Sequence, residues 1–181
     1  LKLAFPLRIT QSRATASAPF GWMTRTPNGE EEPCQGWVDL SGQATTGERG
    51  LCLVNDSQYG YDTLEGELRL SVLRSPIYAF HVPRRYVPSV QYHFVDQGQQ
   101  TLRYLLLPHG GDWRTVNPAR RSLEWQEPLF VRPAAPQTGE WGDVSLLRVE
   151  PENVQLTTVK LAEEDGCLLA RGFEAYGFIL K

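Results

Sequence analysis

Apolar and polar residues alternate in several short stretches of this chain. Leu68, Leu70 and Val72 alternate with Arg69 and Ser71. Successive side chains of a strand point to opposite faces, so this alternation predicts a strand that is buried on one face only. The same period of two occurs at residues 1–9, 89–95 and 101–107. The pattern is typical of antiparallel strands that cover a core.

Turn residues separate these stretches. The run DQGQQ at 96–100 predicts a hairpin that joins a strand at 89–95 to a strand at 101–107. Further along the chain, three more stretches predict a meander of strands, namely residues 143–150, 153–162 and 166–174.

Helical patterns are rare, because thirteen prolines and sixteen glycines interrupt the chain. We predict one short helical turn near Pro118 to Glu124. Many short strands need a second layer to bury their apolar faces, so the sequence predicts an all-β fold, an antiparallel β-sandwich. Residues 125–142 are rich in proline and lack periodicity, which predicts a long crossing and a seam between two sub-domains.

Composition narrows the possible partners. The chain has 181 residues, of which 41% are hydrophobic, which is enough for a substantial core. Its 18 basic residues are scattered among 21 acidic ones, so we expect no nucleic acid partner. The apolar runs are far shorter than the roughly 20 residues that cross a bilayer, so we expect no membrane partner.

The chain has three widely spaced cysteines, Cys34, Cys52 and Cys167. An odd number at such spacings fits neither a disulfide framework nor a zinc site, and it favours reduced thiols in a cytoplasmic protein. Residues 1–10 do not resemble a signal peptide, and the first residue is not Met. We therefore expect the chain to be a piece of a longer protein.

Sequence motifs for catalysis are missing. The histidines at 81, 93 and 109 do not show a metal-ligand spacing, and a structural role is expected for each. The sequence contains no Gly-x-Ser-x-Gly motif, phosphate-binding glycine loop or dinucleotide motif. Acidic residues at 30–32 are expected in a solvated turn. The two carboxylates of a glycoside hydrolase are brought together by the fold and not by sequence spacing. The many Asp and Glu residues of this chain therefore neither support nor exclude such a pair.

The stretch GLCLVNDSQYGYD at 50–62 begins like a buried strand and ends in a polar, tyrosine-rich turn. Asn55 and Asp56 tolerate turn backbone, Gly60 permits close approach, and Tyr59 and Tyr61 offer aromatic faces that suit a sugar. A plain β-turn whose tyrosines cover the edge of a core explains the same residues. Both interpretations stay open.

Five stretches occur together in order, at residues 28–42, 50–62, 67–78, 106–114 and 145–174. In this order they resemble the C-terminal part of bacterial-type α-mannosidases of glycoside hydrolase family 38. The resemblance runs from Leu1 to near the end of the chain. Relatives of this kind continue with further strands, so we expect the chain to lack one edge of its second sheet.

The resemblance implies a galactose-mutarotase-like sandwich that packs against two absent parts, an N-terminal catalytic α/β domain and a helical bundle. It places the carboxylate nucleophile and a divalent metal, zinc or cobalt, in the absent catalytic domain. The family's His-x-Asp metal motif does not occur in this sequence. The resemblance therefore implies a parent that hydrolyses α-mannosides and a segment that is inactive alone. A homo-oligomeric parent stays open.

Arg74 is a second candidate for contact with substrate. In animal members of the family an arginine near the end of the corresponding strand lies close to the mannose site, and the register through ELRLSVLR brings Arg74 there. A planar guanidinium can donate two hydrogen bonds at once, either to hydroxyls or to a carboxylate. A salt bridge at the strand end is the alternative.

Two other functions stay open beside this one. A stand-alone carbohydrate-binding sandwich would bind sugar without a catalytic partner. A mutarotase-like epimerase would need an acid and a base in one cleft.

Overall fold

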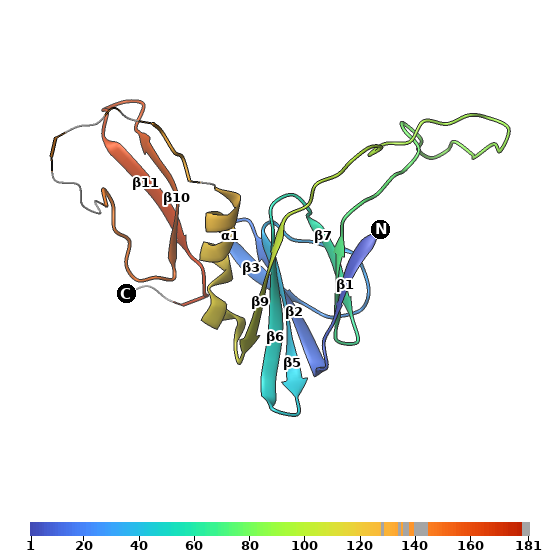
Figure 1. Ribbon diagram of the computed structural model, residues 1–181, viewed down its shortest axis with the longest axis horizontal. Coiled ribbons are helices and arrows are strands. Elements are labelled where there is room, and N and C mark those ends of the chain that lie inside the picture. The colour runs from blue at the N-terminus through green and yellow to red at the C-terminus, as the bar shows by residue number, and fades with distance from the viewer. Residues whose placement is uncertain (128, 134, 136–137, 140–144, 179–181) are drawn as a thin grey trace.

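The computed structural model describes residues 1–127, 129–133, 135, 138–139 and 145–178 (Figure 1). Over these residues the chain is built mainly of antiparallel strands. They are β1 (Lys2–Pro6), β2 (Thr10–Ala18), β3 (Gly21–Arg25), β4 (Glu32–Pro33), β5 (Trp37–Ala44), β6 (Gly47–Asn55), β7 (Gly60–Leu64), β8 (Glu67–Ser71), β9 (Tyr104–Gly110), β10 (Val154–Leu161) and β11 (Leu168–Glu174). A 3-10 helix, η1 (Trp113–Val116), and an α-helix, α1 (Pro118–Gln126), follow β9.

Two sheets form the body of the molecule. Four strands pair in the order β1, β8, β7, β4, and five strands pair in the order β3, β2, β5, β6, β9. All of these pairings are antiparallel. Side chains from both sheets share one core, so the predicted all-β antiparallel sandwich is confirmed.

The core between the sheets contains the apolar face that the alternation predicts. Leu68 and Leu70 of β8 are buried there against Val38 and Leu40 of β5. Leu3 of β1 packs against the same core, as the alternation at 1–9 predicts. Each fully buried aliphatic side chain of this size stabilises the fold by about 1.5–3 kcal/mol.

A second core covers the outer face of the five-stranded sheet. Trp37, Cys52 and Val54 on that face pack against Trp113 of η1. Strand β6 is therefore buried on both faces, which explains its unbroken apolar run. Asn117 has a left-handed backbone (φ 47°) and caps α1, whose first residue is Pro118. The short helix predicted at 118–124 is confirmed.

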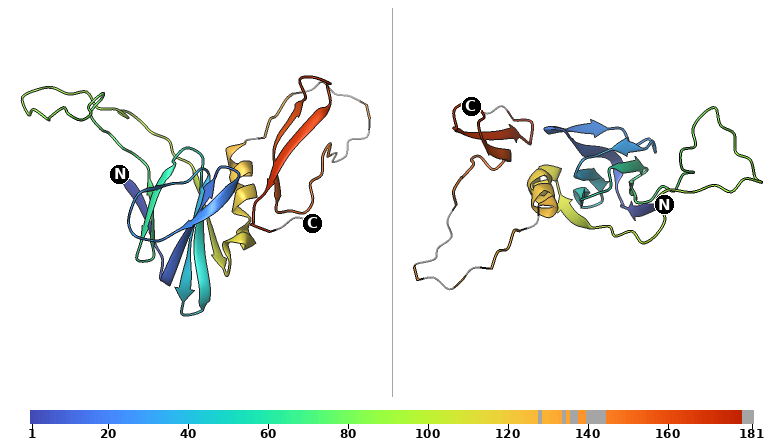
Figure 2. Two further views of the ribbon diagram at one scale, coloured as in Figure 1. Left: turned by 180° about the vertical axis from the view of Figure 1, so that it is seen from behind. Right: turned by 90° about the horizontal axis from the view of Figure 1, so that it is seen from above.

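Strands β10 and β11 form a separate two-stranded sheet beyond α1 (Figures 1 and 2). An edge-to-face contact between Phe20 and Phe173, with ring centroids 6.0 Å apart, joins the hairpin to the β2–β3 turn. The strands predicted at 153–162 and 166–174 are thus confirmed.

Residues 74–101 leave the sandwich between β8 and β9 and extend far from it (Figures 1 and 2). We call this segment the arm. The predicted strand at 89–95 and its hairpin with 101–107 are wrong, because 89–95 lies in the arm with only an isolated bridge between Ile77 and Phe94. Strand β9 begins at Tyr104 and pairs with β6 instead.

Two predictions fall in the less regular part of the chain. Residues 145–150 contain no strand, so the predicted meander is a hairpin over the described residues, and 143–144 lie outside them. The predicted crossing at 125–142 begins with the last turn of α1. Residues 128, 134, 136–137 and 140–142 of that crossing lie outside the described part of the chain.

The cysteines have the predicted state, since Cys34, Cys52 and Cys167 are all free thiols. Among the described residues, no helix combines the length and the apolar character that crossing a membrane requires.

Candidate functional site

A pocket with mostly polar lining lies where the arm leaves the sandwich. It has a volume of about 290 Å³. Its polar lining comes from Glu31, Gln58, Ser71, Arg74, Asp96 and Gln100. We call it the polar pocket. Its carboxylates, amides, hydroxyl and guanidinium offer both donors and acceptors, which is what a sugar hydroxyl needs.

Three parts of the fold bring these side chains together. Arg74 follows the end of β8 at Ser71 and opens the arm, and Asp96 and Gln100 lie on its returning half. Gln58 comes from the turn between β6 and β7. Arg74 therefore shares the polar pocket with Gln58 and Gly60 of the turn at 55–60, whereas Asn55, Asp56 and Tyr59 of that turn do not line it.

Glu31 is held in the pocket by a charge network. Lys2 of β1 lies 3.1 Å from the Glu31 carboxylate and also pairs with the buried Asp62. The hydrogen bond from Lys2 lowers the pKa of Glu31, and the charge of Arg74 adds to this effect. Glu31 is therefore a fixed anion at neutral pH and not a proton donor.

Gly60 permits the close approach that the sequence predicts. A Cβ at residue 60 would lie 2.8 Å from the Glu31 Oε1 atom. The close neighbour is thus a side chain of the same chain, and a larger residue at 60 would displace Glu31 from the pocket.

Asn55 holds the turn together. It is buried at the end of β6, and its Oδ1 atom accepts a hydrogen bond from the Gln58 backbone N–H at 3.0 Å. Its Nδ2 group donates to the Cys34 sulfur at 3.7 Å, and its carbonyl accepts from Gln126 of α1 at 3.0 Å. These contacts give Asn55 a structural role.

Asp56 and Tyr61 also contact protein groups. Asp56 forms an ion pair with Arg103 at 2.7 Å. Burial raises the pKa of Asp56, but the hydrogen bonds from Arg103 and Ser57 and the charge of Arg103 together outweigh burial and lower the pKa overall. Tyr61 is 1% exposed in the core, and burial raises its pKa to about 12. Its hydroxyl has no hydrogen-bond partner among the described residues.

Tyr59 remains at the surface, with 58% of its area exposed. It lines a neighbouring, more apolar pocket of about 730 Å³ together with Met23, Arg25 and Gln35. Gln58 and Tyr59 are adjacent in sequence but line different pockets. Tyr59 and Arg74 therefore do not share one site.

Sequence reasoning missed Glu31, Ser71, Asp96 and Gln100 of the polar pocket. Glu31 stood in a run interpreted as a solvated turn, Ser71 on the polar face of a predicted strand, and Asp96 and Gln100 in one run interpreted as a hairpin turn. These three parts of the chain are far apart in sequence or belong to different elements, so no local spacing could have joined them. The close approach expected at Gly60 was a local indication that another group, here Glu31, lies beside the turn.

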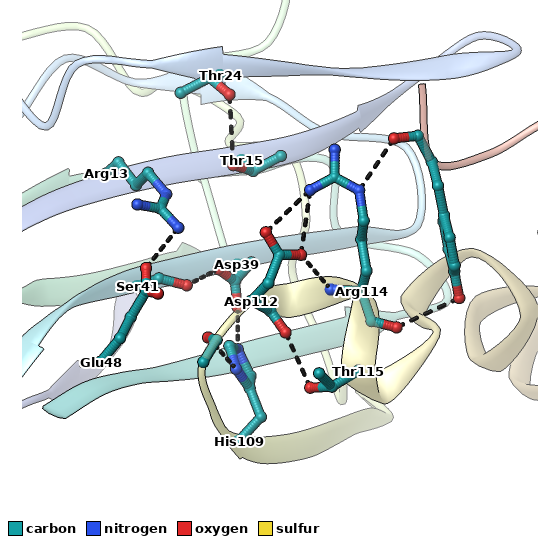
Figure 3. A network of polar contacts seen from close by, with 12 residues as sticks. Arg13, Thr15, Thr24, Asp39, Ser41, Glu48, His109, Asp112, Arg114 and Thr115 are labelled. Carbon is teal, nitrogen blue, oxygen red and sulfur yellow. Dashed lines mark hydrogen bonds and ion pairs between the residues drawn. The ribbon is translucent and has the colours of Figure 1, made fainter. Parts of the chain in front are cut away.

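A second polar cluster lies within the five-stranded sheet (Figure 3). The His109 Nε2 atom of β9 lies 2.7 Å from Asp39 Oδ1 of β5, and both side chains are buried. The Ser41 hydroxyl donates to the other oxygen of Asp39. The His109 Nδ1 atom contacts the Gly111 carbonyl at 3.2 Å.

This cluster is arranged for structure and not for nucleophilic attack. Ser41 and His109 both bond to Asp39, so the imidazole does not accept the Ser41 proton as a general base would. His109 reaches Asp39 across the intervening strand β6 at Gly50, which has no side chain. The structural role expected for this histidine fits these contacts.

Within the described residues, no three His, Cys, Asp or Glu side chains come together in a way that could hold a metal ion. The polar pocket thus offers hydrogen bonds and charge, which can bind and orient a polar ligand.

Comparison with known protein families finds a match over residues 1–84, to the C-terminal domain of glycosyl hydrolases family 38. Two mammalian proteins match over 98% of this chain: α-mannosidase 2C1 of Homo sapiens at 31% identity and that of Mus musculus at 30%. α-Mannosidase G of Dictyostelium discoideum is 25% identical over 78% of the chain.

The chain spans 16% of the length of the two mammalian relatives and 12% of the third. All three relatives are eukaryotic, so they give no support to the bacterial-type part of the resemblance.

Proposed function

We propose that this chain is the non-catalytic C-terminal part of an α-mannosidase, because residues 1–84 match the C-terminal domain of glycosyl hydrolases family 38. The relatives that match nearly the whole chain are α-mannosidases, which supports this assignment. The all-β sandwich with its own two cores gives the segment the stability of a structural domain.

The polar pocket is the part of this chain that we assign to the sugar. The supporting observation is that Arg74 and Gln58 line it together with Glu31. The guanidinium fork can donate two hydrogen bonds to neighbouring hydroxyls, and the fixed carboxylate can accept one. In the parent, these groups would form one wall of the substrate cleft and orient the sugar.

The reaction of the parent would be hydrolysis of terminal α-mannosides with retention, which uses a carboxylate nucleophile and a second carboxyl group as acid and base. We assign both groups to the absent catalytic domain. A zinc or cobalt ion would bind in that domain too, as the family resemblance implies.

The catalytic and helical domains of the same parent are the partners we propose. The three free thiols, two of them buried, fit a parent that works in the cytoplasm. Linkage preference depends on groups outside this chain.

The test compares the full-length parent with the isolated chain in hydrolysis of a chromogenic α-mannoside. We expect activity in the parent only. Activity of the isolated chain would show that a nucleophile lies within these 181 residues and would disprove the assignment.

The role of Arg74 is tested in the full-length parent. Loss of a charged hydrogen-bond donor to substrate costs about 1.5–3 kcal/mol, so Arg74→Ala should lower kcat/KM about 10- to 100-fold. Arg8→Ala removes another exposed arginine away from the pocket and should leave kcat/KM unchanged. Equal effects of the two changes would argue against a sugar-facing pocket.

The alternative of a stand-alone carbohydrate-binding module is tested with mannose and the isolated chain. We expect no binding by calorimetry up to about millimolar sugar, because one wall of a cleft buries little of a ligand. Saturable binding in that range would favour the alternative.

A further inference from the structure

The outer face of the four-stranded sheet carries charged side chains from three neighbouring strands. Lys2 of β1, Arg69 of β8 and Asp62 of β7 lie on this face, because the residues next to them along each strand pack into the core between the sheets. Charged residues on an outer face normally lie in solvent. The Asp62 side chain does not, since it is only 1% exposed. This buried carboxylate therefore needs partners that replace water.

Asp62 anchors Lys2. The Lys2 ammonium donates a hydrogen bond to Asp62 Oδ2. The Arg69 Nε atom lies 3.0 Å from Asp62 Oδ1 in an ion pair, but these two atoms do not form a hydrogen bond. The Lys2 side chain thus crosses β8 to reach β7, and the buried anion there fixes the position of its Nζ atom.

Lys2 also holds Glu31, which comes from the loop before β4. The Lys2 Nζ atom lies 3.1 Å from Glu31 Oε2. The other oxygen, Oε1, lies over Gly60, where a Cβ would come within 2.8 Å of it. Glu31 and Gly60 both line the polar pocket. Lys2 therefore binds one oxygen of the carboxylate, and the other oxygen is placed at the pocket, where it can accept a hydrogen bond from a ligand.

The Glu31 side chain needs a partner to keep this position. It is 43% exposed, and a glutamate in water samples many rotamers. Arg74 lines the same pocket and acts on Glu31 by its charge. Within the described part of the chain, however, Lys2 is the residue that forms an ion pair with Glu31.

We propose that Lys2 is a positioning residue for the sugar: it holds the Glu31 carboxylate at the polar pocket, and the buried Asp62 holds Lys2. This inference rests on the proposed function. A sugar hydroxyl that meets a carboxylate already in place does not have to immobilise it on binding, so Lys2 contributes affinity without touching the ligand. The alternative is a charge network that only stabilises the sheet.

Lys2→Met in the full-length parent tests the positioning role in hydrolysis of a chromogenic α-mannoside. The change removes the ammonium and keeps an unbranched apolar side chain. We expect KM to rise about tenfold while kcat stays within about twofold, because Glu31 contacts hydroxyls that the substrate and the transition state share.

Two further lysine variants calibrate this result. Lys2→Arg keeps the charge and at least two donors, so its KM should stay within about threefold of that of the unchanged parent. The matched control is Lys160→Met. Lys160 is also a strand lysine paired with a glutamate, Glu163 at 3.6 Å, but it lies on β10 outside the pocket, so KM should not change.

A double-mutant cycle shows whether Lys2 acts through Glu31. Glu31→Gln alone should raise KM about tenfold, because it replaces the charged acceptor by a neutral amide. Lys2→Met added to Glu31→Gln should raise KM no further, since the carboxylate that Lys2 positions is already lost. Effects that multiply to about 100-fold would show that the two residues act independently and would overturn the proposal.

Thermal unfolding of each variant separates positioning from stability, because Lys2→Met also removes a partner of the buried Asp62. A lower melting temperature with an unchanged KM would mean that the network serves only the sheet, and the proposal would be wrong. If Lys2→Met does not fold in the parent, Lys2→Gln takes its place. Its amide still donates toward Asp62 but lacks the charge that holds Glu31, so the same rise in KM is expected.

Failure of this inference differs from failure of the proposed function. If Glu31→Gln raises KM and Lys2→Met does not, the pocket binds the sugar and Lys2 does not position it. If Glu31→Gln and Arg74→Ala both leave KM unchanged, or if the parent does not hydrolyse α-mannosides, the sugar-facing pocket is refuted and the positioning role with it.

Discussion

Gly50 permits a side-chain contact that spans three strands of the larger sheet. Strand β6 lies between β5 and β9, and residue 50 pairs with Ser41 on one side and His109 on the other. A Cβ at residue 50 would lie 2.5 Å from the His109 Cε1 atom and 2.7 Å from the Ser41 Oγ atom. The absent side chain thus makes room for the His109 to Asp39 hydrogen bond.

Gly50→Ala should therefore destabilise the isolated chain by about 1–3 kcal/mol, because the methyl group must displace buried polar partners. Urea unfolding measures the change. Gly21→Ala is the matched control, since a Cβ there meets nothing within 4 Å. If the Gly50→Ala and Gly21→Ala proteins were equally stable, the hydrogen bond between His109 and Asp39 would not depend on the missing side chain at residue 50.

The contact between His109 and Asp39 also predicts a pH dependence. Burial lowers the pKa of His109, but the hydrogen bond and charge of Asp39, the hydrogen bond with the Gly111 carbonyl and the charge of Asp112 together outweigh burial and raise the pKa above its ordinary value. A raised folded-state pKa means that the protonated histidine stabilises the fold. This stabilisation is complete below the unfolded pKa of about 6.5 and is lost as pH rises through the folded pKa.

We therefore expect His109→Gln to destabilise the chain more at about pH 5.5 than at about pH 8.5, in paired urea unfolding experiments. The neutral amide of glutamine can still hydrogen-bond Asp39, so it removes mainly the titration. His81→Gln, on the exposed arm, is the control for replacing a histidine outside the cluster around Asp39. A penalty that is equal at both pH values, or larger at high pH, would contradict the assignment of charge to His109.

At the scale of elements, alternation predicted strands correctly where the apolar face meets a core. Leu68 and Leu70 of β8 are buried as predicted, and the apolar residues of β1, Leu3 and Phe5, are partly buried against the same core. The stretch at 89–95 has the same period and failed. Its alternate residues make contacts within the arm instead. The Tyr92 ring stacks on Tyr86, and Phe94 forms an isolated bridge with Ile77. Periodicity records that residues share a face, but not what covers that face.

The candidate site was predictable only in part, for a related reason. Arg74 was identified from the resemblance, and it does line the polar pocket. Asn55 and Tyr61 have residue types that suit sugar binding, yet backbone and core contacts bury both. Polar side chains in a turn can hydrogen-bond to their own backbone as readily as to a ligand, and the sequence does not distinguish these two roles. Glu31 came from a distant loop, which only the fold brings near.

At the scale of the whole molecule, the hairpin of β10 and β11 depends on the sandwich. A two-stranded sheet alone is marginally stable in water. The segment after β11 anchors it: the Arg114 Nε group donates to the Tyr176 carbonyl at 2.9 Å, and the Tyr176 hydroxyl donates to the Arg114 carbonyl at 3.3 Å. The Tyr176 ring also meets Trp113 of the second core edge to face, with centroids 6.0 Å apart.

Tyr176→Ala should therefore loosen the hairpin before it loosens the sandwich. Removing the ring and hydroxyl takes away the hairpin's contact with Trp113, while the core between the two large sheets keeps its own side chains. In amide hydrogen exchange, we expect protection in β10 and β11 to fall about 10- to 100-fold, with little change in β5 and β6.

Tyr176→Phe separates the two parts of the anchor, because it keeps the ring against Trp113 and loses only the long hydrogen bond to the Arg114 carbonyl. It should leave most of the protection in β10 and β11 intact. If Tyr176→Ala lowers protection equally in all strands, the hairpin and the sandwich unfold as one unit. If it leaves β10 and β11 unchanged, the Phe20 to Phe173 contact is the anchor instead, and Phe20→Ala should then produce the loss.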